Sequence, residues 1–460
     1  MLDAQFSSLP LSKAQLANLE SLKYKQMTPV QAASLPQALE GKDLIVQAKT
    51  GSGKTAAFGL GLLDRINPKF FGTQAMILCP TRELADQVAK ELRTLARCIP
   101  NIKLMTLCGG TPLRPQADSL EHGAHIVVGT PGRIKDHLSR ETLDLNSLDT
   151  LVLDEADRML DMGFYDEIMH IVKNAPKERQ TLLFSATYPN TIKKMCRSIQ
   201  RDSVEIKIDS EHESDVISQL FFETNNYQRK DTLLALLEHY QPQNTVVFCH
   251  TKIQCNEIAS FLREKNIDAL ELHGDLEQRD RDQVFVKFGN NSCAVLVATD
   301  VAARGLDIKS LAAVINYELP YDPEIYVHRI GRTGRAGEKG LAFSLFTELE
   351  VPRIIAIEDF KGAEAEYGEV EALMRQTDFS LKASMTTLQL DSGKKNKIRP
   401  GDLLGALTKD AGLQGSKIGK INIYDMYSYI AVETDVADKA LSHFRHGKVK
   451  GKKVKARIVK

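Results

Sequence analysis

The chain has 460 residues, and at about 150 residues per domain this length predicts roughly three domains. Hydrophobic residues make up 43% and charged residues 26%, which excludes an intrinsically disordered chain. The 60 basic and 60 acidic residues balance overall but not along the chain. Residues 391–460 hold 16 basic and 7 acidic residues, a net of +9, which leaves 44 and 53 in residues 1–390, a net of −9. An acidic body with a basic tail suggests two separate tasks.

Membrane insertion and export are not expected from this sequence. No apolar run approaches the ~18 residues of a membrane-spanning helix, and Met1–Phe6 shows no signal-peptide pattern. The seven cysteines are odd in number and form no C-x-x-C pair, and Cys79 and Cys249 lie in apolar runs. We therefore expect a cytoplasmic protein with free thiols, no zinc and no disulfide partner.

Apolar runs rich in Val, Ile and Leu recur from the start of the chain, each followed by polar or glycine-rich residues and a helical pattern. This alternation predicts a parallel sheet covered by helices. The first set of expected strands is 44–46, 75–79, 125–128, 151–153 and 181–184. The second set is 245–249, 269–272, 294–297, 312–315 and 341–346. The polar, acidic residues 209–216 between the two sets are predicted to be a linker.

A third unit of a different kind follows a second linker, expected at 369–384. The predicted strands are 386–391, 420–423, 427–432 and 453–458, and the predicted helices are 401–409 and 435–444. The resulting β-α-β-β-α-β order is typical of a small split β-α-β domain. We therefore expect an α/β protein with two tandem parallel-sheet domains, at 1–208 and 217–368, followed by a small α+β domain at 385–460.

A glycine-rich loop follows the first predicted strand and precedes a helical pattern. It matches the phosphate-binding pattern G-x-x-x-x-G-K-[ST] except for Ala48 at its first position. Backbone N–H groups of such a loop bind phosphates, Lys54 can reach the β- and γ-phosphates, and the Thr55 hydroxyl can ligate Mg²⁺. A glycine turn before an ordinary helix is the alternative. The predicted nucleotide-binding residues of the loop are Ala48, Lys49, Thr50, Gly51, Ser52, Gly53, Lys54 and Thr55.

The predicted strand 151–153 ends in a cluster of carboxylates. Asp154 is then placed to hold Mg²⁺ beside the loop, largely through water and phosphate, and Glu155 to orient or deprotonate the attacking water. Such clusters are usually solvated turns, but a phosphate-binding loop about 100 residues upstream favours the catalytic interpretation.

The residues Asp154-Glu155-Ala156-Asp157 spell the signature of the DEAD-box RNA helicases, which the chain resembles over residues 6–350. The resemblance implies two RecA-like domains and an RNA-stimulated ATPase that uses ATP and Mg²⁺ to separate short RNA duplexes. The other segments that match family motifs, in order, are Thr28–Gln31, Pro80–Leu84, Gly109–Gly110, Thr130–Arg133, Ser185–Thr187, Val247–Thr251, Gln278–Arg281, Ala298–Asp307 and His328–Arg335.

The same resemblance implies roles for single residues. Gln31 would read adenine and Tyr24 would pack on it, although Lys23 stands where the family often has Gly. An ion pair of Arg82 with Glu83 or another acid is an alternative to RNA contact. The further ATP-site residues are Asp154, Gly305 and Asp307. The residues expected to couple ATP to strand separation are Asp157, Ser185, Ala186, Thr187 and His328. The RNA-contacting residues of the core are Thr81, Arg82, Gly110, Thr130, Gly132, Arg133, Thr251, Gly274 and Thr299.

Phosphoryl transfer needs positive charge around the γ-phosphate. Arg332 and Arg335 lie three apart in a glycine-bearing segment and can act as arginine fingers, a contribution on the order of 10³–10⁵ in rate. With Lys54 and Glu155 they are the predicted catalytic residues; solvated loop arginines are the alternative. Because loop and fingers lie on different predicted domains, hydrolysis should require closure, which RNA bound to both domains would promote.

The small C-terminal domain resembles an RNA-recognition motif in its order of elements. Such sheets normally stack bases on aromatic side chains. Tyr427 and Tyr429 share one face, but Gln389, Asp425 and Val432 depart from the usual pattern, so the two tyrosines either stack bases or simply cover the sheet. The basic residues lie in loops, which can bind RNA through its backbone. Those predicted to do so are Lys394, Lys395, Lys397, Arg399, Lys448 and Lys450.

A DEAD-box core followed by this basic domain resembles the DbpA subfamily. That resemblance implies a 23S ribosomal RNA hairpin and pre-50S particles as partners, and a role in assembly of the large ribosomal subunit. We expect a monomer without a membrane partner. Two other functions remain open: an ATP-gated RNA-binding clamp or chaperone with incidental unwinding, and a DNA-directed helicase.

Overall fold

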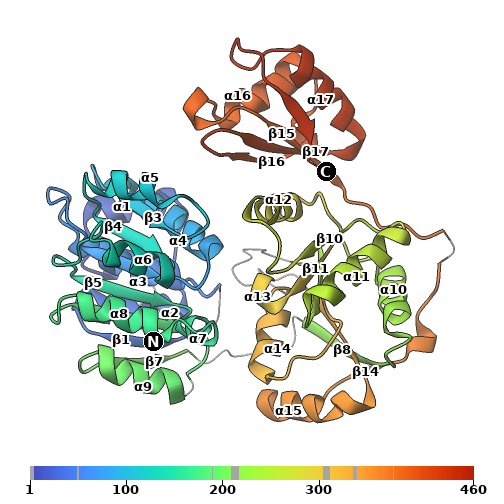
Figure 1. Ribbon diagram of the computed structural model, residues 1–460, viewed down its shortest axis with the longest axis horizontal. Helices are drawn as coiled ribbons and strands as arrows, with labels where there is room; N and C mark the ends of the chain where they lie inside the picture. Colours follow the sequence, from blue (N-terminus) through green and yellow to red (C-terminus); the bar gives the residue numbers. More distant parts are fainter. Residues whose placement is uncertain are drawn as a thin grey trace. The chain divides into compact units, whose positions relative to one another are not determined.

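The computed structural model describes residues 5–48, 51–188, 190–208, 217–303, 311–334, 339–376 and 378–459. The chain divides into two compact units, Met1–Glu211 and His212–Lys460, coloured along the sequence in Figure 1. No helix within the described ranges has the length and hydropathy needed to cross a membrane. The predicted linker at 209–216 lies outside the described residues.

The first unit is built on a parallel sheet, as predicted, and the sheet has seven strands. The strand order is β3-β4-β2-β5-β6-β1-β7. Its strands are β1 (Leu44–Gln47), β2 (Ala75–Leu78), β3 (Leu104–Leu107), β4 (Ile126–Gly129), β5 (Thr150–Asp154), β6 (Gln180–Ser185) and β7 (Val204–Lys207). Its helices are α1 (Lys13–Ser21), α2 (Pro29–Leu39), α3 (Lys54–Arg65), α4 (Arg82–Leu95), α5 (Leu113–Leu120), α6 (Pro131–Ser139), α7 (Ala156–Asp161), α8 (Tyr165–Asn174) and α9 (Asn190–Ile199). The two edge strands, β3 and β7, were not among the predicted strands.

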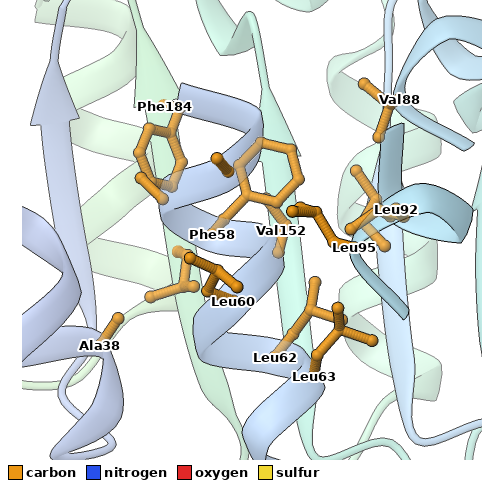
Figure 2. Close-up of a cluster of buried hydrophobic side chains, with 14 of the residues drawn as sticks. Ala38, Phe58, Leu60, Leu62, Leu63, Val88, Leu92, Leu95, Val152 and Phe184 are labelled. Atoms are coloured by element: carbon orange, nitrogen blue, oxygen red, sulfur yellow. The ribbon is translucent and has the colours of Figure 1, made fainter. Parts of the chain in front are cut away.

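Helices cover both faces of this sheet (Figure 1), because successive side chains of a strand point to opposite faces. Val46 and Ile77 belong to one buried cluster, whereas Met76 and Leu78 belong to another. Figure 2 shows the first cluster, in which Phe58 and its neighbours on α3 pack between the sheet and α4. This burial fixes helix α3, which begins at the end of the phosphate-binding loop.

The second unit contains another seven-stranded parallel sheet, in the order β10-β11-β9-β12-β13-β8-β14. Its strands are β8 (Ile217–Glu223), β9 (Thr245–Cys249), β10 (Ala269–Leu272), β11 (Val295–Thr299), β12 (Ala313–Asn316), β13 (Gly340–Phe346) and β14 (Tyr367–Gly368). Its helices are α10 (Arg229–Tyr240), α11 (Lys252–Glu264), α12 (Gln278–Gly289), α13 (Asp300–Ala303), α14 (Pro323–Ile330) and α15 (Val351–Lys361). All five predicted strands are present, and β8 and β14 were not predicted.

The C-terminal part of the second unit is a four-stranded antiparallel sheet in the order β16-β17-β15-β18. The predicted β-α-β-β-α-β order is confirmed, and a five-residue π-helical turn, Ala406–Asp410, follows the first helix. Its strands are β15 (Met385–Leu390), β16 (Ile418–Ile423), β17 (Ser428–Glu433) and β18 (Ala456–Ile458), and its helices are α16 (Pro400–Gly405) and α17 (Ala437–His446).

The aromatic side of this small sheet is covered within the chain. Tyr429 is 4% exposed and lies in one apolar cluster with Val459 and with Val286 of α12, against which Tyr424 and Tyr427 also pack. Thr387 Oγ1 strengthens this contact, 2.7 Å from Ser292 Oγ. For Tyr429 this packing favours covering the sheet, because a nucleobase has no access to a ring that is already buried. Tyr427 is only half-buried, and its role stays a prediction.

Candidate nucleotide and RNA site

The phosphate-binding loop has the backbone conformation that only glycine adopts without strain. Gly51 and Gly53 have φ values of 87° and 93°, in the region that L side chains rarely occupy. A Cβ on Gly53 would also stand 2.5 Å from Gln31 Nε2. Lys54 is 6% exposed, and its Nζ donates to Ala48 O at 3.0 Å. Lys49 and Thr50 lie outside the described residues.

Gln31 links the start of α2 to this loop. Its Oε1 accepts from the Thr28 N–H at 2.9 Å, and its Nε2 donates to Gly53 O at 3.1 Å. Tyr24 is half-buried, and its ring meets that of Phe6 edge-on at 6.1 Å. Phe6 was not predicted as a site residue; an isolated aromatic in a polar N-terminal segment was the available signal. The structure thus brings Gln31 to the phosphate loop, while adenine recognition by Gln31 and Tyr24 stays a prediction.

The carboxylates at the end of β5 are buried. Asp154 is 3% and Glu155 is 5% exposed. Burial raises the pKa of Asp154 to about 7, and the nearby positive charge of Lys54 opposes that rise. Within the described part of the chain, Asp154 Oδ1 is buried without a hydrogen-bond partner. A buried carboxylate oxygen left in this state suits a Mg²⁺ shell, because hard cations prefer oxygen ligands.

Asp157 binds the segment Ser185–Thr187 directly. Its Oδ2 accepts from Ala186 N at 3.1 Å, from Thr187 N at 3.0 Å and from Thr187 Oγ1 at 3.1 Å. The Asp157 N–H in turn lies 3.3 Å from Ser185 Oγ. The carboxylate cluster and this segment are therefore held as one piece, which is the arrangement that coupling requires.

Replacing Asp157 with Ala is expected to slow strand separation at least tenfold while ATP hydrolysis falls severalfold. The substitution removes three partly buried hydrogen bonds, each worth about 0.5–1.5 kcal/mol, and so loosens Ser185–Thr187. Parallel ATPase and strand-release measurements test this. Asp144→Ala is the control, because Asp144 Oδ1 also accepts a backbone N–H, from Asn146 at 2.9 Å. Equal losses of both activities would contradict a coupling role for Asp157.

The predicted RNA-contacting residues of the first unit gather at one edge of the sheet. Strands β3, β4 and β2 are neighbours, so the loops at their carboxyl ends lie side by side. Thr81 caps α4 by accepting the Leu84 N–H at 3.2 Å. The Arg82 guanidinium lies against Gly110, where φ is 76° and a Cβ would stand 1.6 Å from Arg82 Nη1. Thr130 and Gly132 lie at the start of α6.

The second unit has a comparable edge. Thr251, Gly274 and Thr299 follow or end the adjacent strands β9, β10 and β11. Arg329 is 2% exposed and makes a bidentate ion pair with Asp300, with both N–O distances at 2.7 Å. Arg329 was not predicted as a site residue, although it lies inside the matched segment His328–Arg335. Gly305, Asp307 and Arg335 lie outside the described residues; His328 and Arg332 lie on and after α14, half-buried.

The basic loops of the C-terminal domain meet one another. Lys450 Nζ donates to Lys397 O at 3.0 Å and lies 3.5 Å from Asp402 Oδ2. This contact joins the loop before α16 to the loop before β18. We call the joined surface the basic edge; its residues are Lys394, Lys395, Lys397, Arg399, Lys448, Lys450, Lys452 and Lys453, all exposed.

Three family models match separate parts of the chain. The DEAD/DEAH box helicase model matches residues 28–195, and the helicase conserved C-terminal domain matches residues 228–337. The DbpA RNA binding domain matches residues 387–458. The first match spans β1–β6, the second spans β9–β12 and the third falls on the small antiparallel sheet.

Whole-chain relatives agree with these matches. The chain is 55% identical over 456 residues to the ATP-dependent RNA helicase DbpA of Escherichia coli, covering 99% of each chain. It is 37% identical to the DbpA of Bacillus subtilis, covering 98% of each. Among solved structures, Saccharomyces cerevisiae Dbp5 bound to RNA and ADP BeF3 is similar with a TM-score of 0.74 and 31% identity, covering 80% of this chain and 96% of that one.

Proposed function

Because this chain belongs to the DEAD-box family of ATP-dependent RNA helicases, we propose that its basic edge anchors it to a hairpin of 23S ribosomal RNA. The core then separates a neighbouring short duplex during assembly of the large ribosomal subunit. The observation that carries the proposal is the contact between two basic loops through Lys450 and Lys397. It brings two exposed, lysine-rich loops together on a domain whose Tyr429 is buried.

A surface of this kind suits a folded RNA. Phosphate groups attract lysine and arginine regardless of sequence, and proteins recognise structured RNA largely through its shape and backbone. Residues 391–460 carry a net charge of +9, whereas residues 1–390 carry a net charge of −9. The core can therefore release its strands while the C-terminal domain holds the RNA.

In the proposed mechanism the N–H groups of the phosphate loop and Lys54 bind the phosphates of ATP. Thr55 and Asp154 would hold Mg²⁺, which supplies positive charge at the transferring phosphoryl group when it is bound. Glu155 accepts a proton from the attacking water or orients it. Arg332 and Arg335 would stabilise charge on the γ-phosphate, and the Asp157 clamp on Ser185–Thr187 would transmit hydrolysis to the RNA-binding edge.

Crosslinking of the full chain to total cellular RNA tests the proposed target. We expect the crosslinks to concentrate in one hairpin of 23S RNA, and a distribution that follows RNA abundance would contradict the proposal. Duplexes of about ten base pairs are then tethered to that hairpin or to a scrambled one. Strand release is expected to be at least tenfold faster with the authentic hairpin. Full ATPase activity without strand release would instead favour an ATP-gated clamp.

A further inference from the structure

Gln116 on α5 lies outside every motif named above, yet it is the centre of a hydrogen-bond network at the RNA edge of the first unit. Its Nε2 donates to Cys108 O at 3.1 Å and to Thr111 Oγ1 at 2.9 Å. Its Oε1 accepts from Arg133 Nη1 at 2.8 Å and lies 3.0 Å from His137 Nε2. One amide group therefore joins the segment that contains Gly109 and Gly110 to helix α6.

Arg133 closes the same network from the other side. Its Nη2 donates to Thr111 O at 3.0 Å, while Nη1 is bound to Gln116. The Arg133 side chain is 10% exposed, and its Nε lies 3.7 Å from Asp136 Oδ2. Both terminal nitrogens of the guanidinium are thus directed into the protein, and little of the group faces solvent.

His137, which also lies on α6, contacts the side-chain oxygen of Gln116. The side chain is fully buried, and its Nδ1 lies 2.8 Å from Thr142 Oγ1. The hydrogen bond from Arg133 identifies this atom of Gln116 as the amide oxygen. Because an amide oxygen can only accept, the ring Nε2 of His137 donates to it. Burial and the positive charge of Arg133 lower the pKa of His137, which keeps the ring neutral in this position.

We infer that Gln116 is a positioning residue for RNA binding, which holds the Gly109–Gly110 loop against the first turn of α6. The two segments then present their backbone N–H groups to one RNA strand, and Arg133 acts as a clasp within the protein. The open space around the Cα of Gly132 allows close approach of a phosphate backbone to the start of α6, and the Arg82 guanidinium that lies against Gly110 adds positive charge beside the loop. The inference rests on the proposed use of this edge for RNA.

Gln116→Met tests it, because methionine preserves volume and removes all four polar contacts. The RNA concentration for half-maximal ATPase activity is expected to rise about tenfold, since four hydrogen bonds that hold the two segments together, three of them partly buried, are lost. The rate at saturating RNA and the KM for ATP are expected to stay within about twofold. Substitution of a residue that only stabilises the fold would not raise the RNA requirement while leaving the rate at saturating RNA and the KM for ATP unchanged.

Gln180→Met is the matched control. Gln180 is 3% exposed, and its Nε2 donates to Ala38 O and Lys42 O, both at 2.8 Å, at the amino end of β6, far from the RNA edge. We expect a comparable loss of Tm without a change in the RNA requirement. If Gln116→Met behaves like this control, the inference is overturned.

A double-substitution cycle tests the role given to Arg133. If Arg133 acts as a clasp, Arg133→Met adds less to Gln116→Met than it costs alone, because the hydrogen bond that the two residues share is already lost. A further loss of affinity, together with a salt slope reduced by about 0.7, would make Arg133 a phosphate ligand and overturn that role. If RNA does not stimulate the ATPase activity of the unsubstituted protein, the proposed function itself is contradicted.

Discussion

Glu155→Gln is expected to lower the RNA-stimulated ATPase rate by about 10³-fold, within the range that general-base catalysis contributes. Glutamine has the same shape but cannot accept the proton of the attacking water. Glu155 is 5% exposed, so the substitution opens no path for solvent to replace the carboxylate. Binding of ATP and RNA is expected to stay within about threefold, because removing a negative charge beside the γ-phosphate does not weaken nucleotide binding.

The measurement is single-turnover hydrolysis in parallel with equilibrium binding of a fluorescent ATP and of labelled RNA. Glu178→Gln is the control, since Glu178 is an exposed glutamate of the same unit and its loss should leave every quantity unchanged. A complex of Glu155→Gln with ATP and RNA is expected to persist, because hydrolysis no longer releases it. An ATPase rate close to that of the unsubstituted protein would contradict the role of Glu155 in activating the attacking water.

A second large effect is expected from neutralising three exposed lysines of the basic edge, Lys394, Lys395 and Lys448. Substitution of all three by Ser is expected to weaken binding of a 23S RNA fragment by ten- to a hundredfold at moderate salt. The slope of log K against log salt should also fall by about 2, because each phosphate contact contributes roughly 0.7 for single strands. The core ATPase rate at saturating RNA should be unchanged.

The matched control removes the same charge from other exposed lysines of the domain, Lys409, Lys439 and Lys455. Equal losses in the two triple variants would mean that net charge, and not the basic edge, holds the RNA. This comparison is sharper than deletion of residues 385–460. Deletion would also expose Val286 of α12 and remove the partner of Ser292, and so would disturb the second unit.

The sequence alone determined the fold class and the position of the glycine-rich loop between β1 and α3. Central strands of a parallel sheet are buried on both faces, so their continuous apolar runs stand out, and the polar loops that follow them must meet at one edge. Edge strands carry a weaker signal. In β7, Val204 and Ile206 alternate with exposed Glu205 and Lys207, a pattern that four residues cannot distinguish from a loop. The domain boundaries and the roles of single site residues remain predictions.

Only the tertiary structure decided which side chains outside the motifs contact residues within them. Folding brings carbonyl and guanidinium groups to Gln116, and it brings the ring of Phe6 to that of Tyr24. Tyr427 and Tyr429 could be placed on one face by their spacing, because side chains alternate along a strand. The burial of Tyr429 against Val286 depends on a contact across more than a hundred residues, which no local sequence pattern indicates.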